Sequence, residues 1–125
     1  MAITLIKAKR RLSERYGFDI IEESALGKSN GDIVKGEARP PVTIAIRSDL
    51  EPTMKLIAMA HEAGHLINYN QTRKEHLHGG AVVVETTAWL NGLSIAIGFG
   101  ILKEYTNYWK YHLGKTIKYS SENTS

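Results

Sequence analysis

The segment His61-Glu62-Ala63-Gly64-His65 constrains the fold of this chain more than any other feature of its sequence. Two histidines four residues apart come together when the backbone between them is helical, because they then lie on one face, about 6 Å apart along the axis. Imidazoles placed in this way can bind one Zn²⁺ at about 2.0–2.1 Å each. Glu62 falls on a neighbouring part of that face, where a carboxylate reaches a metal-bound water rather than the metal. The spacing therefore predicts a helix that carries part of a zinc site, a pattern typical of metallopeptidases.

The residues before the motif supply the signals of a helix start. Ser48 and Glu51 have the spacing of a capping box, and Pro52 suits the first turn of a helix. These signals predict a helix over residues 50–69 that carries the motif in its second half. Apolar residues occur on more than one side of this helix, which indicates a buried helix. They are Met54, Leu56, Ile57, Ala60, Gly64 and Ile67.

The remaining patterns predict a single α+β domain for the chain of 125 residues. An amphipathic helix is expected over 3–16, ending at Gly17, and a short strand over 18–21. We expect the domain to comprise residues 1–119, and the polar segment 120–125 to be a disordered tail. The other expected elements are a loop or irregular hairpin over 24–41, a half-buried strand over 42–47, a polar loop over 70–80, and helices over 82–97 and 101–118, the first of them broken by Gly98 and Gly100.

A catalytic zinc site needs a third protein ligand and an open position for water. The chain contains no cysteine, so the ligands must be histidines and carboxylates. Glu85 is the one acid in the apolar stretch 82–89, and a buried carboxylate is costly unless it is paired or bound to a metal. This favours Glu85 as the third ligand, donated by a second helix packed on the first. The alternative is an exposed Glu85 in the first turn of its helix, where the helix dipole favours an acid.

His76 and His78 are rival ligands because they follow the motif helix in the next loop. Either could fold back onto the metal, or could donate to a substrate carbonyl or a tetrahedral oxyanion. The alternative for both is a loop histidine in water. Tyr105, Tyr108 and His112 of the last helix are further candidates for the oxyanion donor. Helix packing is the alternative for the aromatic residues, and the sequence does not choose among these five.

The longer zinc motif H-E-x-x-H-x-x-G-x-x-H is absent, because Asn68 and Gln71 stand at the positions of its glycine and third histidine. The sequence is instead similar to the ImmA/IrrE-type zinc metallopeptidases. The likeness rests on the motif at 61–65 and, about twenty residues on, Glu85-Thr86-Thr87-Ala88-Trp89, in which a glutamate is followed three residues later by an alanine. It covers roughly residues 40–95 and resembles most the small single-domain members found on phages and other mobile elements.

This resemblance implies a compact, minimal zincin-like domain in which the motif helix packs on a second ligand-bearing helix and a C-terminal helix. It implies His61, His65 and Glu85 as Zn²⁺ ligands. It also implies that Glu62 is the catalytic acid and base in the hydrolysis of a peptide bond of a regulatory protein. The chain departs from the family where it has Trp89-Leu90-Asn91-Gly92, since other members commonly read Asn and then Phe-Ala, ending near a proline. It also lacks the helix-turn-helix or other extra domain of larger members.

A protein or peptide is the expected partner, and the strand over 42–47 is a candidate edge to which an extended peptide could add. A second candidate surface is the first helix, which is basic apart from Glu14 and could contact nucleic acid or an acidic partner. The alternative for this helix is a solvated surface. Its basic residues are Lys7, Lys9, Arg10, Arg11 and Arg15.

The chain begins without an apolar signal segment, and the notable apolar run, from Leu93 to Leu102, is interrupted by two glycines. A membrane span needs about 18 apolar residues. We therefore expect a cytoplasmic protein without membrane contact. The competing function is a zinc-stabilised binding or inhibitor module of a phage or mobile element, without proteolytic activity. A fourth protein ligand on the metal would indicate such a module, since structural zinc sites are closed.

Overall fold

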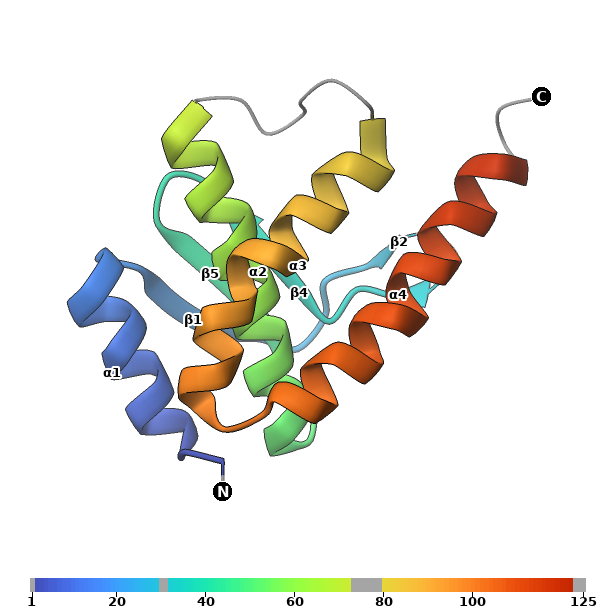
Figure 1. Ribbon diagram of the computed structural model, residues 1–125. Helices are drawn as coiled ribbons and strands as arrows, with labels where there is room; N and C mark the ends of the chain where they lie inside the picture. The colour runs from blue at the N-terminus through green and yellow to red at the C-terminus, as the bar shows by residue number, and fades with distance from the viewer. Residues whose placement is uncertain (1, 30–31, 73–79, 123–125) are drawn as a thin grey trace.

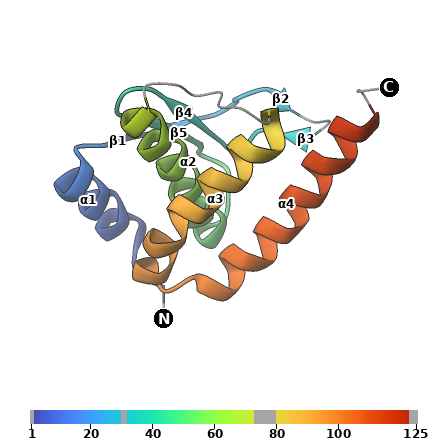
Figure 2. The same cartoon turned by 45° about the horizontal axis from the view of Figure 1, so that its top comes forward.

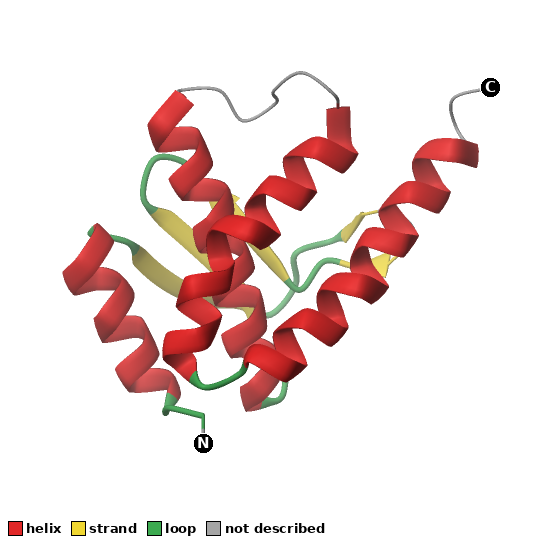
Figure 3. Ribbon diagram, in the orientation of Figure 1, coloured by secondary structure: helices red, strands yellow, loops and turns green. Residues whose placement is uncertain are grey.

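The computed structural model describes residues 2–29, 32–72 and 80–122, and these form an α+β fold, as predicted (Figure 1). Within the described residues, four helices gather on one side of a small sheet (Figure 3). The elements in chain order are α1 (Leu5–Tyr16), β1 (Asp19–Glu23), β2 (Lys28–Ser29), β3 (Asp32–Ile33), β4 (Gly36–Arg39), β5 (Thr43–Arg47), α2 (Pro52–Thr72), α3 (Gly80–Phe99) and α4 (Leu102–Glu122).

The sheet has the strand order β1-β5-β4, so β5 is its central strand. β5 runs parallel to β1 and antiparallel to β4, and Ile44 stands between Ile20 and Ala38. Ile44 and Ala45 point to opposite faces of the sheet, and both are buried. The interpretation of residues 42–47 as an exposed edge is therefore wrong, because other strands pair with both sides of β5. The edge strand that contacts α2 is β4.

The sequence does not predict β4, because its residues Gly36-Glu37-Ala38-Arg39 include no β-branched or aromatic side chain. Pairing with β5 defines the strand. On the outer face of the sheet, the guanidinium of Arg39 donates two hydrogen bonds, of 2.7 and 2.9 Å, to the carboxylate of Glu23 in β1. This contact crosses β5 at Ala45, whose small side chain is fully buried. β2 and β3 pair as the irregular hairpin expected in this region.

α1 matches the first predicted helix and ends at Gly17, whose φ of 73° suits a glycine. Two polar contacts fix α1 to the rest of the fold. Lys9 pairs with Glu22 of β1 at 3.0 Å, and the guanidinium of Arg11 donates to the carbonyl oxygen of Gly98 in α3 at 2.7 Å. α1 therefore lies beside both the sheet and the end of α3.

α2 begins at Pro52, so the prediction that this proline occupies the first turn is confirmed. The predicted capping box is wrong. Ser48 lies in a turn before the helix, and its backbone N–H donates to the carbonyl oxygen of Glu23 at 2.9 Å. The chain thus leaves the sheet next to β1 before the helix begins, and Glu51 rather than Ser48 directly precedes it.

α2 and α3 make the most extensive contact between helices (Figure 1). Two glycines lie where the two helices approach each other. Gly64 of α2 lies against the backbone carbonyl of Ala88, and Gly92 of α3 lies against the backbone carbonyl of Ala60. A Cβ at either glycine would collide with backbone atoms, which cannot rotate away as a side chain can. These glycines therefore set the distance between the helix that carries the motif and the helix that carries the third predicted ligand.

Gly64→Ala is expected to lower the free energy of unfolding by about 1–3 kcal/mol, as overpacking does in other cores. Alanine is favoured over glycine inside a helix by about 0.5–1 kcal/mol, but the collision with Ala88 outweighs that preference. Gly114→Ala is the matched control, because a Cβ at this exposed position of α4 meets nothing within 4 Å and should stabilise the protein. Urea denaturation measures both changes, and a stabilised Gly64→Ala variant would contradict the close helix contact.

The later helices are longer than predicted. α3 runs through Gly98 and ends before Gly100, whose φ of 75° is left-handed, so only the second glycine ends the helix. α4 continues to Glu122 and therefore includes the first residues of the segment 120–125 that was expected to be a tail. Residues 123–125 lie outside the described part of the chain.

α3 has the length and apolar composition that would let a helix cross a membrane, which the sequence analysis did not expect. In the fold this helix packs against α2 and α4, and 39% of its most apolar 18-residue stretch is buried. The core helix of a folded domain meets the same criterion, so this one helix is weak evidence for a membrane span.

Candidate metal centre

The structure brings His61 and His65 of α2 together with Glu85 of α3. The Nε2 atom of His61 lies 3.0 Å from Oε1 of Glu85, and Nε2 of His65 lies 2.9 Å from Oε2. The candidate ligand atoms all lie within 4.8 Å of one another. In a tetrahedral site with bonds of about 2.0–2.2 Å, ligand atoms are separated by roughly 3.3–3.6 Å. The three residues could therefore hold a metal ion with only small movements of their side chains.

The surroundings of His61 and Glu85 favour the protonation states that metal ligands need. Burial lowers the pKa of His61 to about 4, so its imidazole is neutral near pH 7. Burial alone would raise the pKa of Glu85, but its hydrogen bonds with His61 and His65 outweigh burial and hold that pKa well below its usual value. A neutral imidazole and an ionised carboxylate are the forms that bind Zn²⁺.

Glu85 does not lie exposed in the first turn of its helix, which was the alternative to a role as ligand. It lies in the second turn of α3, and its side chain is 20% exposed and directed at the two histidines of α2. The prediction that a lone acid in an apolar helix has partners is therefore confirmed. The donor set of two imidazoles and one carboxylate is one that zinc accepts in catalytic sites.

Glu62 is buried next to the cluster, at 8% exposure, and lies beside the edge strand β4. A Cβ added to Gly36 would stand 2.9 Å from Cγ and 3.3 Å from Oε2 of Glu62. Only glycine leaves this space, so the backbone of β4 passes directly beside the Glu62 carboxylate. Sequence reasoning missed Gly36, since its role depends on the pairing of β4 with β5.

Trp89 completes one wall of the cluster and was also missed as a site residue. Its ring stacks on His61 with 4.0 Å between ring centres, and its Nε1–H donates to Nδ1 of His112 at 3.3 Å. The same Nδ1 atom lies 3.7 Å from Oε1 of Glu85. Trp89 follows Glu85 by four residues, and this spacing on one helix face is a signal that could have identified it.

The remaining predicted site residues divide into three groups. His112 lies at the cluster, as described above. The ring of Tyr108 is stacked beside that of His112, with 6.3 Å between the ring centres. The hydroxyl of Tyr105 is buried and donates to the backbone carbonyl of Trp89 at 2.6 Å, which is a packing role. Burial, with a smaller contribution from the charge of Glu62, raises the pKa of Tyr105, so this phenol stays protonated. His76 and His78 lie outside the described residues.

The second ring nitrogen of His61, the one that does not face Glu85, lacks the hydrogen bond that is usual in zinc sites. Histidines that bind zinc usually donate their second ring N–H to a carboxylate, a carbonyl or water. In the described part of the chain, the buried Nδ1 of His61 has no hydrogen-bond partner. The position of His61 is instead set by Trp89 on its face and by Glu85 at Nε2.

Comparison with protein-family models, with curated proteins and with solved structures finds no significant match to this chain. The convergence of His61, His65 and Glu85, with Glu62 buried beside His61 in the chain, is thus the main indication of function.

Proposed function

We propose that this protein is a zinc-dependent endopeptidase, with His61, His65 and Glu85 as the metal ligands. The observation that carries the proposal is the convergence of these three donors from two helices. Glu62 adds support, since a purely structural zinc site has no need of a buried acid at this position. The resemblance of the motif and of residues 85–89 to ImmA/IrrE-type peptidases points to the same activity.

Bound zinc would supply Lewis acidity and a lowered pKa for the attacking water. Glu62 accepts the proton of that water as it attacks the peptide carbonyl, and then passes the proton to the leaving amine. His112 is the best-placed candidate to stabilise the oxyanion. Because its Nδ1 accepts a hydrogen bond from Trp89, the neutral ring carries its proton on Nε2, where it can donate.

The substrate peptide would bind along β4. β4 is an edge strand, and an extended peptide can add to such an edge through main-chain hydrogen bonds. Since Gly36 of β4 touches Glu62, a peptide on this edge passes next to the proposed base. We therefore propose β4, rather than β5, as the strand to which the peptide adds. The family resemblance further suggests a regulatory protein as the substrate.

Removal of the metal tests the proposal directly. The purified protein is expected to contain close to one zinc per chain and to cleave members of a quenched-fluorescence peptide library. A chelator should abolish cleavage and lower the melting temperature, and added zinc should restore both. A ligand present at 100 times its Kd stabilises a fold by about 2.7 kcal/mol, which a thermal scan resolves. A protein that neither binds zinc nor responds to the chelator would rule out the proposed function.

A further inference from the structure

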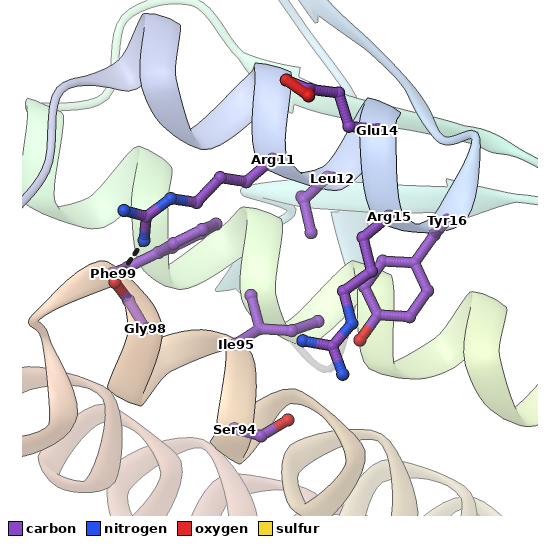
Figure 4. A pocket seen from close by; sticks show the side chains of 9 residues that line it. All are labelled: Arg11, Leu12, Glu14, Arg15, Tyr16, Ser94, Ile95, Gly98 and Phe99. Atoms are coloured by element: carbon purple, nitrogen blue, oxygen red, sulfur yellow. Dashed lines mark hydrogen bonds between the residues drawn. The ribbon is translucent and has the colours of Figure 1, made fainter.

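A cavity of about 360 Å³ lies between α1 and α3 (Figure 4). α1 and α4 lie on opposite sides of α3 (Figure 2). Its floor is apolar and consists of Leu12 from α1 and of Ile95 and Phe99 from α3. This volume is at the lower end of the range of about 300–1,000 Å³ found for ligand pockets. The cavity is therefore large enough for an apolar side chain of a partner, with some surrounding groups.

Two guanidinium groups stand at the rim of this cavity. Arg11 uses one nitrogen to donate to the carbonyl oxygen of Gly98, and Arg15 lies 5.3 Å from the ring centre of Tyr16 (Figure 4). Neither arginine forms an ion pair with a carboxylate in the described residues, and Glu14 is the one acid in the lining. A cationic rim over an apolar floor favours a ligand that carries carboxylates next to an apolar group.

α3 extends this surface with a row of exposed apolar residues. Val83, Leu90 and Ile97 are seven residues apart, so they lie along one side of the helix, and they are 40%, 54% and 56% exposed. Ser94, which lines the cavity, falls between Leu90 and Ile97 on the same side. The outward side of α3 thus offers an apolar strip that leads to the two arginines.

We propose that the α1–α3 surface, made of the cavity and this strip, docks an acidic amphipathic segment of a partner protein. The apolar side of the segment would cover the strip and the cavity floor, and its carboxylates would pair with Arg11 and Arg15. Charge complementarity supports this occupant, because the basic residues lie on α1 and the only acid of α3, Glu85, faces α2. Nucleic acid would supply phosphates for the arginines, but no aliphatic groups for the cavity floor and the strip.

This docking site is separate from the metal centre. Ser94 follows Glu85 by nine residues on α3, which corresponds to about 14 Å along the helix axis. None of the proposed metal ligands lines the cavity. Docking should therefore persist in a Glu62→Gln variant, and the proposal can fail or succeed independently of the proposed peptidase activity.

The test measures the binding of fluorescent probes to the full chain by anisotropy. The probes are a short peptide with Leu and Glu at helical spacing, the same peptide with Gln in place of Glu, and a short DNA duplex. The Leu/Glu peptide is expected to bind at least about tenfold more tightly than its Gln analogue, because charge-assisted hydrogen bonds are lost in the analogue. Equal affinity of the two peptides, or tighter binding of the duplex, would overturn the proposal.

Two variants locate the binding. Arg15→Glu should weaken binding of the Leu/Glu peptide at least about tenfold. Arg10→Glu is the matched control, because it makes the same charge change on α1 at an exposed residue outside the cavity and should weaken binding less than about threefold. Equal weakening by both variants would overturn the proposal in favour of a general basic surface.

A third variant tests the cavity itself. Ser94→Trp places a large ring at its mouth from an exposed position, and it should weaken binding without lowering the melting temperature. Unchanged peptide affinity in a folded Ser94→Trp protein would overturn the assignment of the cavity.

Discussion

Glu85→Ala is expected to lower the affinity for zinc by more than the roughly 10–100-fold that typically follows loss of an outer-shell partner. Glu85 supplies the only carboxylate of the cluster, and both imidazole Nε2 atoms lie within 3.0 Å of its oxygens. Without it, only the two histidines of the cluster remain, and two ligands do not make a stable zinc site. Competition with a chromophoric chelator measures the change.

Two control variants sharpen the result for Glu85. Glu104→Ala removes an exposed acid from the first turn of α4 and should leave zinc affinity unchanged. His112→Ala should also retain zinc if the site has three protein ligands. A large loss of affinity in His112→Ala would indicate a fourth ligand, and hence the zinc-stabilised binding module rather than the enzyme. Full zinc retention in Glu85→Ala would exclude Glu85 as a ligand.

Glu62→Gln is expected to bind zinc normally and to lose hydrolysis by about 10²–10⁴-fold, the usual contribution of a general acid–base. Glutamine keeps the size of the side chain and therefore its contact with Gly36, but it cannot accept a proton from the attacking water. The measurement is kcat/KM on a peptide that the wild-type protein cleaves, together with the zinc content of both proteins.

Glu14→Gln makes the same chemical change on the exposed face of α1, away from the metal centre, and should leave kcat/KM unaltered. Hydrolysis at the wild-type rate by Glu62→Gln would remove Glu62 from the mechanism. Loss of zinc from that variant would instead show that the carboxylate acts as a ligand. A variant that has lost a ligand contains less zinc, whereas a variant that has lost only the base keeps its zinc. The zinc content of the same samples therefore distinguishes the two roles.

The parts of the site that the sequence predicts are those fixed by local rules. The four-residue spacing of His61 and His65 brings the two side chains together only on a helix, and both residues lie in α2. Glu85 could be identified because a lone acid in an apolar helix needs partners wherever that helix packs. Both inferences need only the sequence near each residue and the cost of removing charge from water.

Other parts of the site depend on contacts between segments that are distant in the sequence. β4 is a strand because β5 pairs with it, and its own residues carry no strand signal. The placement of Gly36 beside Glu62 follows from that pairing and from the packing of α2 on the sheet. In the same way, the hydrogen bond from Trp89 to His112 requires α4 to turn back along α3, which no local pattern specifies.

The glycines at the crossing of α2 and α3 also bear on how relatives of this protein could be found. Backbone contact at Gly64 and Gly92, rather than the size of neighbouring side chains, sets the spacing between the two ligand-bearing helices. A side chain at either glycine would push the two ligand-bearing helices apart. A search pattern for distant relatives should accordingly combine Gly64 and Gly92 with the three proposed ligands at their spacings in this chain, and leave the intervening positions open.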